Sequence, residues 1–301
     1  MILFWGLPGD SPLTAVADLL ARRRVKTAFL DQHDSLEWSV ELNVGDAISG
    51  YLRNESQYLD FAEIKSAYLR PYDTRDLAGV PNEGPGQAHA LGLGEALLGW
   101  ADITPAKVVN RPSAMTPNNS KPYQSMQIRA LGFAVPETLV TTDPEAARQF
   151  WEKHGTVIYK SVSSVRSIVS KLSSKQSARL ENVKWCPTQF QEHIPGTDYR
   201  VHVVGDKVFA SEIESQADDY RYACRNGGEA KIKSARLPRE VADRCRRLAV
   251  GVNLPVAGID LRLTPTGEWY CFEVNPSPGF TYYQNATGQP IAEAVAQYLV
   301  Q

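Results

Sequence analysis

Residues 258–276 read GIDLRLTPTGEWYCFEVNP, and apolar and polar residues alternate on both sides of a central turn. Successive side chains of a β-strand point to opposite faces of a sheet. The pattern therefore predicts two antiparallel strands joined by a four-residue turn at residues 264–267, so that Leu263 faces Glu268. One face of this hairpin is apolar, and on the second strand it continues through Tyr270, Phe272 and Val274.

The other face of the predicted hairpin carries Asp260, Glu273 and Asn275, with Asp260 facing Cys271. Two carboxylates and a carboxamide oxygen suit Mg²⁺, which prefers carboxylates together with phosphate oxygens. The alternative is a solvated face, on which acids alternate with apolar residues in any half-buried strand. The metal site is favoured because NPSPG at residues 275–279 ends the strand directly after the acids and Arg262 helps to balance the charge on that face.

The composition is that of a globular protein with no strong charge bias. The chain has 301 residues, of which 43% are hydrophobic, and 32 Lys and Arg stand against 34 Asp and Glu. A net charge of -2 argues against nucleic acid or an anionic membrane as a bulk partner, because both attract a strong basic surplus. No apolar run approaches the length of a membrane span, the N-terminus does not resemble a signal peptide, and the four cysteines lack C-x-x-C spacing. We therefore expect a cytoplasmic protein with reduced thiols.

The first 110 residues alternate short apolar runs with helical patterns. The run at residues 2–5 stops at a Gly- and Pro-containing loop, after which Ser11 is the predicted N-cap of a helix that begins with Pro12. This strand–helix–strand order predicts a small α/β lobe with a parallel sheet. The polar stretch at residues 110–120 predicts a linker.

The later chain is rich in strand patterns. A helix is predicted to open at Asp143-Pro144 and to stop at Gly155, and another to open at Pro238. The dipeptide Gly205-Asp206 between two apolar runs predicts a two-residue hairpin turn.

Asp260, the run EVNPSPG at residues 273–279 and the run TGQPIA at residues 287–292 resemble the C-terminal signature of ATP-grasp ligases. The resemblance covers residues 107–301 and is to the RimK-like amino-acid ligases and the ATP-grasp maturases of ribosomal peptides. It implies a protein of the α/β class with the ATP-grasp fold, whose individual lobes are of the α+β type. It further implies an N-terminal Rossmann-like pre-ATP-grasp lobe at residues 1–106, a central lobe at 107–188, and a C-terminal lobe at 189–301 that carries the metal site.

The resemblance also assigns roles to side chains. Asp260, Glu273 and Asn275 would hold Mg²⁺ against the phosphates of ATP, with Mn²⁺ as an alternative ion. Five residues would contact the nucleotide itself. Lys121 and Lys160 would lie at the phosphates, Gln191 and Glu192 at the adenine, and Asp198 near the ribose.

Two arginines complete the predicted site. Arg221, in DYRYA at residues 219–223, would hold the γ-phosphate and then an acyl phosphate, because a guanidinium fork suits oxyanions. Arg200 would act beside it. The family usually has a Gly-rich loop after its second lysine, whereas residues 161–167 read SVSSVRS, without Gly.

The leading hypothesis from the resemblance is an ATP- and Mg²⁺-dependent ligase, which joins a peptide or amino-acid carboxylate to an amine or hydroxyl through an acyl phosphate. Two alternatives remain open: a non-catalytic ATP-binding module that regulates assembly, and a phosphoryl transferase on the same fold. Neither nucleic acid nor membrane is expected as a partner, and a homo-oligomer is left open.

Overall fold

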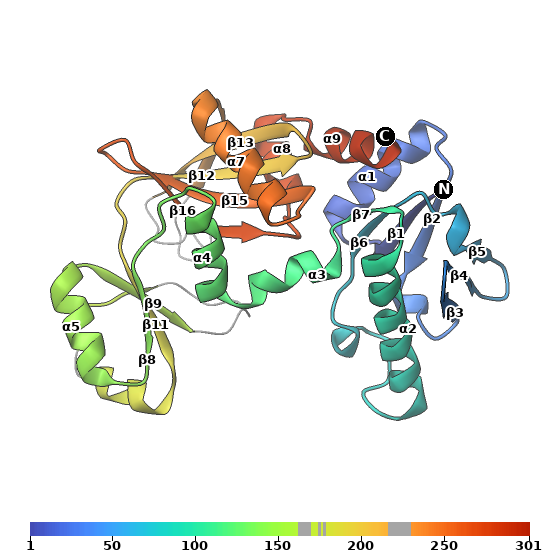
Figure 1. Ribbon diagram of the computed structural model, residues 1–301, viewed down its shortest axis with the longest axis horizontal. Helices are drawn as coiled ribbons and strands as arrows, with labels where there is room; N and C mark the ends of the chain where they lie inside the picture. The colour runs from blue at the N-terminus through green and yellow to red at the C-terminus, as the bar shows by residue number, and fades with distance from the viewer. Residues whose placement is uncertain (162–169, 174–175, 177–178, 216–229) are drawn as a thin grey trace.

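The computed structural model describes residues 1–161, 170–173, 176, 179–215 and 230–301. Within these residues the strands form four sheets, ordered β2-β1-β6-β7, β3-β4-β5, β10-β9-β11-β8 and β14-β13-β12-β15-β16. Figure 1 shows the first two sheets at one end of the molecule and the other two at the opposite end. No helix in the described ranges combines the length and the apolar character that crossing a membrane requires.

The first sheet is parallel throughout, as the sequence predicts. Its strands are β1 (Ile2–Gly6), β2 (Thr27–Asp31), β6 (Ser66–Arg70) and β7 (Lys107–Val109). Parallel strands buried on both faces read as continuous apolar runs rather than alternating ones. The unbroken burial of β1 has this origin.

Helices cover both faces of the parallel sheet. Ile2 and Phe4 pack in one core with α1 (Ser11–Arg22), whereas Leu3 and Trp5 pack in another with α2 (Gly84–Ile103). The N-cap of α1 is Asp10 and not Ser11, since the Asp10 carboxylate accepts the N–H of Leu13 at 2.9 Å. The predicted cap is therefore one residue too late.

A small antiparallel sheet lies beside this layer. Among the described residues it consists of β3 (Ser39–Val44), β4 (Ile48–Arg53) and β5 (Tyr58–Asp60). The 3₁₀ turns of the described chain are η1 (Gln32–Asp34), η2 (Phe61–Glu63), η3 (Thr74–Asp76), η4 (Thr116–Asn119) and η5 (Leu180–Trp185).

The predicted linker at residues 110–120 is largely helical. It contains α3 (Pro112–Met115) and η4, and it leads into α4 (Lys121–Ala130). Arg111 anchors its start, because its guanidinium donates to the carbonyl oxygens that end α2, among them Thr104 at 2.9 Å. Helix-end carbonyls lack partners within their own helix. This contact therefore orders a stretch whose composition indicated an irregular connection.

The third sheet is antiparallel and packs against a helix. Its strands are β8 (Thr138–Thr141), β9 (Val157–Ser161), β10 (Ser170–Lys171) and β11 (Thr188–Glu192), and α5 (Pro144–His154) packs on it. Asp143 caps α5 and Gly155, with a φ of 66°, ends it, as the sequence predicts. Residues 189–192 of β11 lie beyond the predicted lobe boundary, but the strand pairs with β8 and β9.

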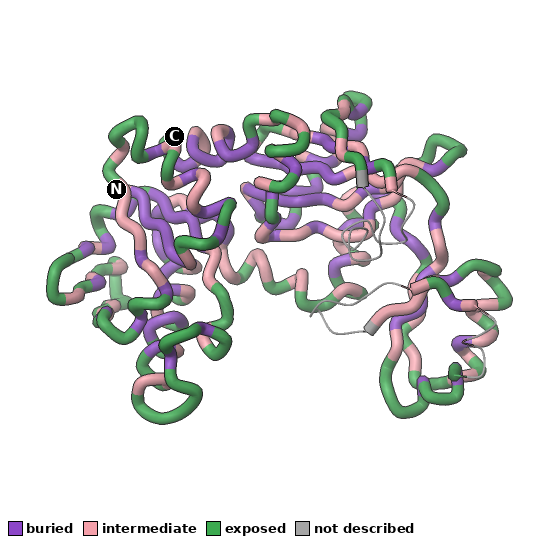
Figure 2. Tube along the Cα trace, turned by 180° about the vertical axis from the view of Figure 1, so that it is seen from behind, coloured by how far each residue is buried: buried purple, intermediate pink, exposed green. Residues whose placement is uncertain are grey.

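In the described ranges the fourth sheet has the most strands of the four and holds five of the ten predicted site residues. Its strands are β12 (Thr197–Val204), β13 (Lys207–Ser215), β14 (Ala230–Ala235), β15 (Val256–Leu263) and β16 (Trp269–Asn275), and the predicted Gly205-Asp206 turn joins β12 to β13. Helices α4 and α7 (Arg239–Gly251) share a core with one face of this sheet. Helix α8 (Thr281–Thr287) lies on the other face, where the Tyr283 ring contacts His202 of β12. Figure 2 shows that the buried residues concentrate in this sheet and in the parallel one.

The last helix, α9 (Ile291–Val300), packs against α1 (Figure 1). Its buried residues, Ile291 and Val295 among them, belong to the core that contains Phe4 and Leu13. Ser66 of β6 donates its hydroxyl hydrogen to the carbonyl of Leu299 at 2.7 Å. The beginning and the end of the chain therefore share one hydrophobic core.

Candidate nucleotide and metal site

The hairpin of β15 and β16 has a different register from the predicted one. Leu263 pairs with Trp269 and not with Glu268, because the loop has one residue more than the predicted turn. Leu261 then pairs with Cys271, but Asp260 pairs with Glu273, so Phe272 is an extra residue in a β-bulge. A bulge shifts the alternation of the strand that contains it.

The bulge decides which residues of β16 face the core. Cys271 and Val274, three positions apart, are both buried in the core under α7. Tyr270 and Phe272 are only partly buried, so the predicted apolar face of β16 is wrong at these two positions. The prediction failed because strict alternation assumes that no extra residue interrupts the pairing.

The acidic cluster forms in spite of this error. Asp260 lies directly opposite Glu273, and Gly258 lies opposite Asn275. The side chains of Asp260 and Glu273 are 22% and 23% exposed, so both carboxylates remain accessible. The three predicted metal ligands therefore share one face of the sheet and offer only oxygen donors, a set that fits Mg²⁺ together with phosphate oxygens.

Each of the two acids has a basic partner. The Nη1 of Arg200 lies 2.6 Å from Oδ1 of Asp260, and these residues are register partners on β12 and β15. Lys121, the first residue of α4, forms an ion pair with Glu273. The structure thus brings the predicted residues Arg200 and Lys121 to the acids.

Arg200 is held in a close-fitting position. A Cβ atom at Gly258 would lie 2.3 Å from Nη2 of Arg200, so only glycine leaves room for the guanidinium. On α8, the ring of Tyr283 lies 5.7 Å from the guanidinium carbon, within cation–π range. Arg200 is 6% exposed and aimed at Asp260.

Helix α4 is fixed against β16 by a residue that the sequence did not indicate. The side-chain amide of Gln124 donates to the carbonyl of Val274 at 2.8 Å and accepts the N–H of Val274 at 3.1 Å. Asn118 Oδ1 lies 3.4 Å from Lys121 Nζ. These contacts place Lys121 over the acidic face.

Asn275 lies at the boundary with the first lobe. Its Oδ1 accepts the N–H of Ser277 at 2.8 Å, which fixes the turn directly after β16. Asn275 lines a cavity of about 480 Å³ whose other walls include Trp5, Tyr72, Glu95 and Asn118. The cavity therefore adjoins both the predicted metal site and the carboxyl ends of the parallel strands.

Arg70 connects the first lobe to the loop after the acids. Its guanidinium forms a two-pronged ion pair with Asp10 at 2.7 and 3.1 Å. The same guanidinium donates to Ser277 Oγ at 2.8 Å and to the carbonyl of Pro278 at 3.2 Å. Sequence patterning offered no signal for this residue, because its partners are distant in the chain.

The sequence suggested that Arg262 balances the charge of the metal ligands. In the structure Arg262 instead pairs with Asp198. The two side chains form a two-pronged contact at 2.7 and 2.9 Å, and Arg262 also donates to the carbonyl of Ile194 at 2.8 Å. The guanidinium carbon lies 5.0 Å from the Phe272 ring centre. The bulge that adds Phe272 to this face therefore supports the arginine that orients Asp198.

The remaining predicted nucleotide residues lie on the third sheet. Lys160 is on β9, and Gln191, 5% exposed, is on β11. The Glu192 carboxylate accepts the N–H of Glu137 at 2.9 Å and lies 3.4 Å from Nδ1 of His154. Arg221 and residues 162–167 of the Gly-free segment fall outside the described residues.

Two groups beside the site are held uncharged by burial. The pKa of His202 lies well below its usual value, because the side chain is buried and Arg200 lies close to it. Burial likewise raises the pKa of the Cys271 thiol well above its ordinary range, with a further contribution from Cys245. Neither group supplies charge or a nucleophile to the acidic face.

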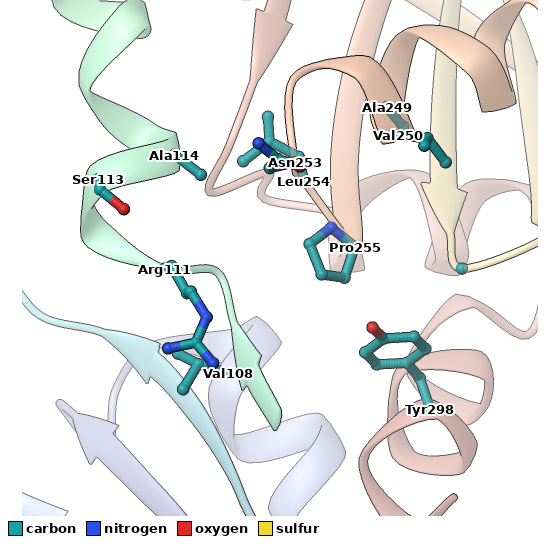
Figure 3. Close-up of a pocket in the computed structure, with 11 residues that line it drawn as sticks. Val108, Arg111, Ser113, Ala114, Ala249, Val250, Asn253, Leu254, Pro255 and Tyr298 are labelled. Carbon is teal, nitrogen blue, oxygen red and sulfur yellow. The ribbon is translucent and has the colours of Figure 1, made fainter. Parts of the chain in front are cut away.

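A second cavity, of about 660 Å³, is shown in Figure 3, and neither Asp260 nor Glu273 lines it. Its walls include Val108 and Arg111 on one side and Pro255 and Tyr298 on the other. The Arg111 guanidinium is already committed to main-chain carbonyls. None of the predicted site residues that the structure describes lines this cavity.

Residues 120–299 match the family model of the RimK-like ATP-grasp domain. The chain belongs to the RimK-like ATP-grasp family. The match spans α4, the third and fourth sheets and α9, and so includes every predicted site residue. The ATP-grasp fold expected from the sequence is confirmed, whereas the Rossmann-like character of the first lobe remains a prediction.

Related proteins are ligases of the same family. The probable alpha-L-glutamate ligase of Cellvibrio japonicus (strain Ueda107) is 37% identical over 113 residues, which cover 37% of this chain and 36% of that protein. This chain thus spans about a third of that relative. The corresponding protein of Vibrio cholerae serotype O1 (strain ATCC 39541 / Classical Ogawa 395 / O395) is 28% identical over 276 residues, with 86% of each chain covered.

Among solved structures, the ATP-grasp ligase PsnB superposes over nearly the whole chain. In its complex with a phosphomimetic variant of a minimal precursor, Mg and ADP, it is 27% identical, with a TM-score of 0.81, and the alignment covers 99% of this chain and 97% of PsnB. The likeness includes the first lobe as well as the region that matches the family model.

Proposed function

We propose that the protein is an ATP- and Mg²⁺-dependent ligase that activates a carboxylate and joins it to an amine. The observation that carries this proposal is the pairing of Asp260 with Glu273 on one sheet face, each next to a basic side chain. Acids that hold a metal and cations that hold phosphate must alternate closely in a site for a metal–nucleotide complex. Membership of the RimK-like ATP-grasp family supports the same activity.

The reaction consists of two transfers. A carboxylate oxygen of the substrate attacks the γ-phosphorus of ATP, and ADP leaves, which gives an acyl phosphate. The nitrogen of an amine then attacks the acyl carbon, loses its proton, and displaces inorganic phosphate to form an amide. A hydroxyl in place of the amine would give an ester. Positioning and charge neutralisation supply most of the catalysis in such transfers.

The side chains of this protein would divide that work. Asp260, Glu273 and Asn275 would hold Mg²⁺, which neutralises the phosphate charge when it is bound. Lys121 and Arg200 would turn from these acids towards phosphate oxygens. Both are already in contact with the acids that would hold the metal, so the required movement is a change of partner rather than a rearrangement of the fold.

We place ATP between the third and fourth sheets, close to the predicted boundary between a central lobe at residues 107–188 and a C-terminal lobe at 189–301. Lys160 and the end of β11, with Gln191 and Glu192, would contact the nucleotide from one side. Asp198, which follows on β12, would approach the ribose. Arg221 would hold the γ-phosphate and then the acyl phosphate.

We propose a peptide as the substrate. PsnB has also been solved with the precursor peptide PsnA2 and AMPPNP, at 26% identity and with 100% of this chain covered. The cavity of about 480 Å³ next to Asn275 opens between the first lobe and the acidic face, where an acyl group could meet the γ-phosphate. The glutamate ligase relatives make an amino-acid substrate the competing outcome of the experiment.

The decisive experiment measures ADP release with and without a carboxylate substrate. Wild-type turnover should depend on the carboxylate, and Glu273→Ala should reduce it at least about 100-fold, as expected for the loss of one electrostatic contact. Glu268→Ala is the matched control, because Glu268 lies in the loop of the same hairpin and should leave turnover unchanged. Turnover that survives Glu273→Ala would rule out the metal assignment.

Product analysis separates the alternatives. A peptide that becomes lighter by one water indicates an internal amide or ester, whereas addition of glutamate indicates the activity named for the relatives. A stable phosphorylated product would instead identify a phosphoryl transferase. Nucleotide-dependent oligomerisation without turnover would identify a regulatory binding module.

A further inference from the structure

Gln124 is a buried polar side chain that does not belong to the predicted site residues. It is 4% exposed and lies on α4, one turn after Lys121. Its amide makes both of its principal hydrogen bonds to one peptide segment: Nε2 donates to the carbonyl of Val274 at 2.8 Å, and Oε1 accepts the N–H of Val274 at 3.1 Å.

These two bonds complete the open edge of a sheet. Strand β16 is the outermost strand of the order β14-β13-β12-β15-β16, so no strand of the described residues pairs with the outward N–H and C=O groups of Val274. Val274 is 1% exposed, and buried main-chain polar groups need partners. The carboxamide of Gln124 offers the same donor and acceptor as a peptide group and substitutes for a strand at this one position.

The position of Val274 gives the contact its importance. Val274 stands between Glu273 and Asn275, whose side chains point to the acidic face while that of Val274 points into the core. Holding both peptide groups of Val274 therefore restrains the two neighbouring side chains. The same helix carries Lys121, which is paired with Glu273.

We propose that Gln124 is a positioning residue. Its two hydrogen bonds to the main chain of Val274 keep the side chains of Glu273 and Asn275 at the spacing that the metal–nucleotide complex requires. The proposal rests on the metal site described under the proposed function. Ligands must be held close to their productive geometry by contacts of their own, and loss of such outer contacts typically weakens metal binding 10- to 100-fold.

The test compares the same substitution, Gln to Met, at two positions of α4 in the 301-residue protein. Gln124→Met keeps the length of the side chain but removes both bonds to Val274. Gln127→Met is the matched control, because Gln127 is half-buried on the same helix and its amide contacts Tyr123 within that helix. Binding of Mn²⁺ in the presence of saturating ADP is followed by the electron paramagnetic resonance signal of free Mn²⁺, together with the thermal unfolding of each variant.

We expect Gln124→Met to weaken Mn²⁺ binding about 10-fold, which corresponds to about 1.4 kcal/mol, and Gln127→Met to leave it unchanged. A lower unfolding temperature with unchanged Mn²⁺ affinity would overturn the proposal, because it would leave Gln124 a purely structural role. If the wild-type protein fails to bind Mn²⁺ with ADP, the metal site itself is wrong, and this result is distinct from the failure of Gln124 alone.

A gentler variant keeps the test decisive if Gln124→Met does not fold. Gln124→Glu retains an acceptor for the N–H of Val274 and loses only the donor to its carbonyl. The Mn²⁺ affinity of Gln124→Glu should then lie below that of Gln127→Glu, which adds the same charge to the same helix. Equal affinity in Gln124→Glu and Gln127→Glu would overturn the proposal.

Discussion

Lys121 forms an ion pair with Glu273, although 152 positions separate the two residues in the chain. A helix that follows the first lobe thus neutralises an acid on the last strand of the fourth sheet. Arg200 does the same for Asp260 across adjacent strands. The acidic face is therefore charge-balanced, and a metal ion that binds there must take the acids from these basic side chains.

Loss of Lys121 should make the fold sensitive to metal. Lys121→Met leaves the Glu273 carboxylate, 23% exposed, without this cation and should lower the free energy of unfolding by about 1–2 kcal/mol. Mg²⁺ should restore part of that loss, because it replaces the missing positive charge. Thermal unfolding with and without Mg²⁺ measures both effects. Lys153→Met, which breaks an exposed ion pair with Glu137, should change little in either condition.

Gly258 should not tolerate even a methyl group. In Gly258→Ala the new Cβ would lie 2.3 Å from Nη2 of Arg200 and 2.8 Å from Cβ of Pro278, so the methyl group would clash with both side chains. The guanidinium of Arg200 must then leave the position from which it would reach the phosphate oxygens, and a misplacement of about 1 Å costs on the order of 100-fold in turnover. Steady-state ATP turnover measures the loss. Gly99→Ala serves as the control, because its Cβ would meet no atom within 4 Å; equal turnover in both variants would refute the packing argument.

His202 should make stability depend on pH. Burial, together with the neighbouring Arg200, holds the pKa of His202 well below its usual 6.5, so the unfolded chain binds a proton that the folded protein does not. Stability should therefore fall as the pH drops below about 6.5 and be unaffected by this residue above it. Between pH 7.5 and 5.5 the wild type should lose about 1.4 kcal/mol more than His202→Phe, as measured by urea unfolding. Parallel losses in the two proteins would contradict the assignment.

Asp198 should act on nucleotide affinity rather than on turnover. Both oxygens of its carboxylate accept hydrogen bonds from Arg262, which orients the group but leaves lone pairs for a ribose hydroxyl. Asp198→Asn should raise the KM for ATP about 10-fold, or about 1.4 kcal/mol, with little change in kcat. The wild-type preference for ATP over 2′-deoxy-ATP or 3′-deoxy-ATP should shrink in the variant. A fall in kcat alone would place Asp198 elsewhere in the mechanism.

Alternation in the sequence predicted the chemistry of the hairpin better than its geometry. Asp260, Glu273 and Asn275 could be assigned to one face because polar residues recur on both strands. The bulge at Phe272 could not be predicted from alternation, because an extra residue in a strand is stabilised by contacts across the sheet, here with Arg262. The prediction of the N-cap of α1 failed for a related reason. Asp10 and Ser11 are both good N-cap residues, and the choice of Asp10 is supported by its ion pair with Arg70, which is distant in the chain.

Residues that act through distant main-chain groups were also missed. Gln124 looks like any helical glutamine until β16 is placed beside it. Strand β3, in contrast, had a readable signal, since Val40, Leu42 and Val44 alternate with polar residues. Its omission was an error of interpretation and not a limit of the sequence.

The core shared by α1 and α9 has a consequence for synthesis on the ribosome. Helix α1 leaves the ribosome early, but Ile291 and Val295, which cover its apolar side, are translated about 270 residues later. Until then Leu13 and Val16 lack part of their packing, and partly assembled chains expose apolar surface to aggregation. Expression of residues 1–106 alone should therefore yield insoluble protein, because the apolar side of α1 is then exposed.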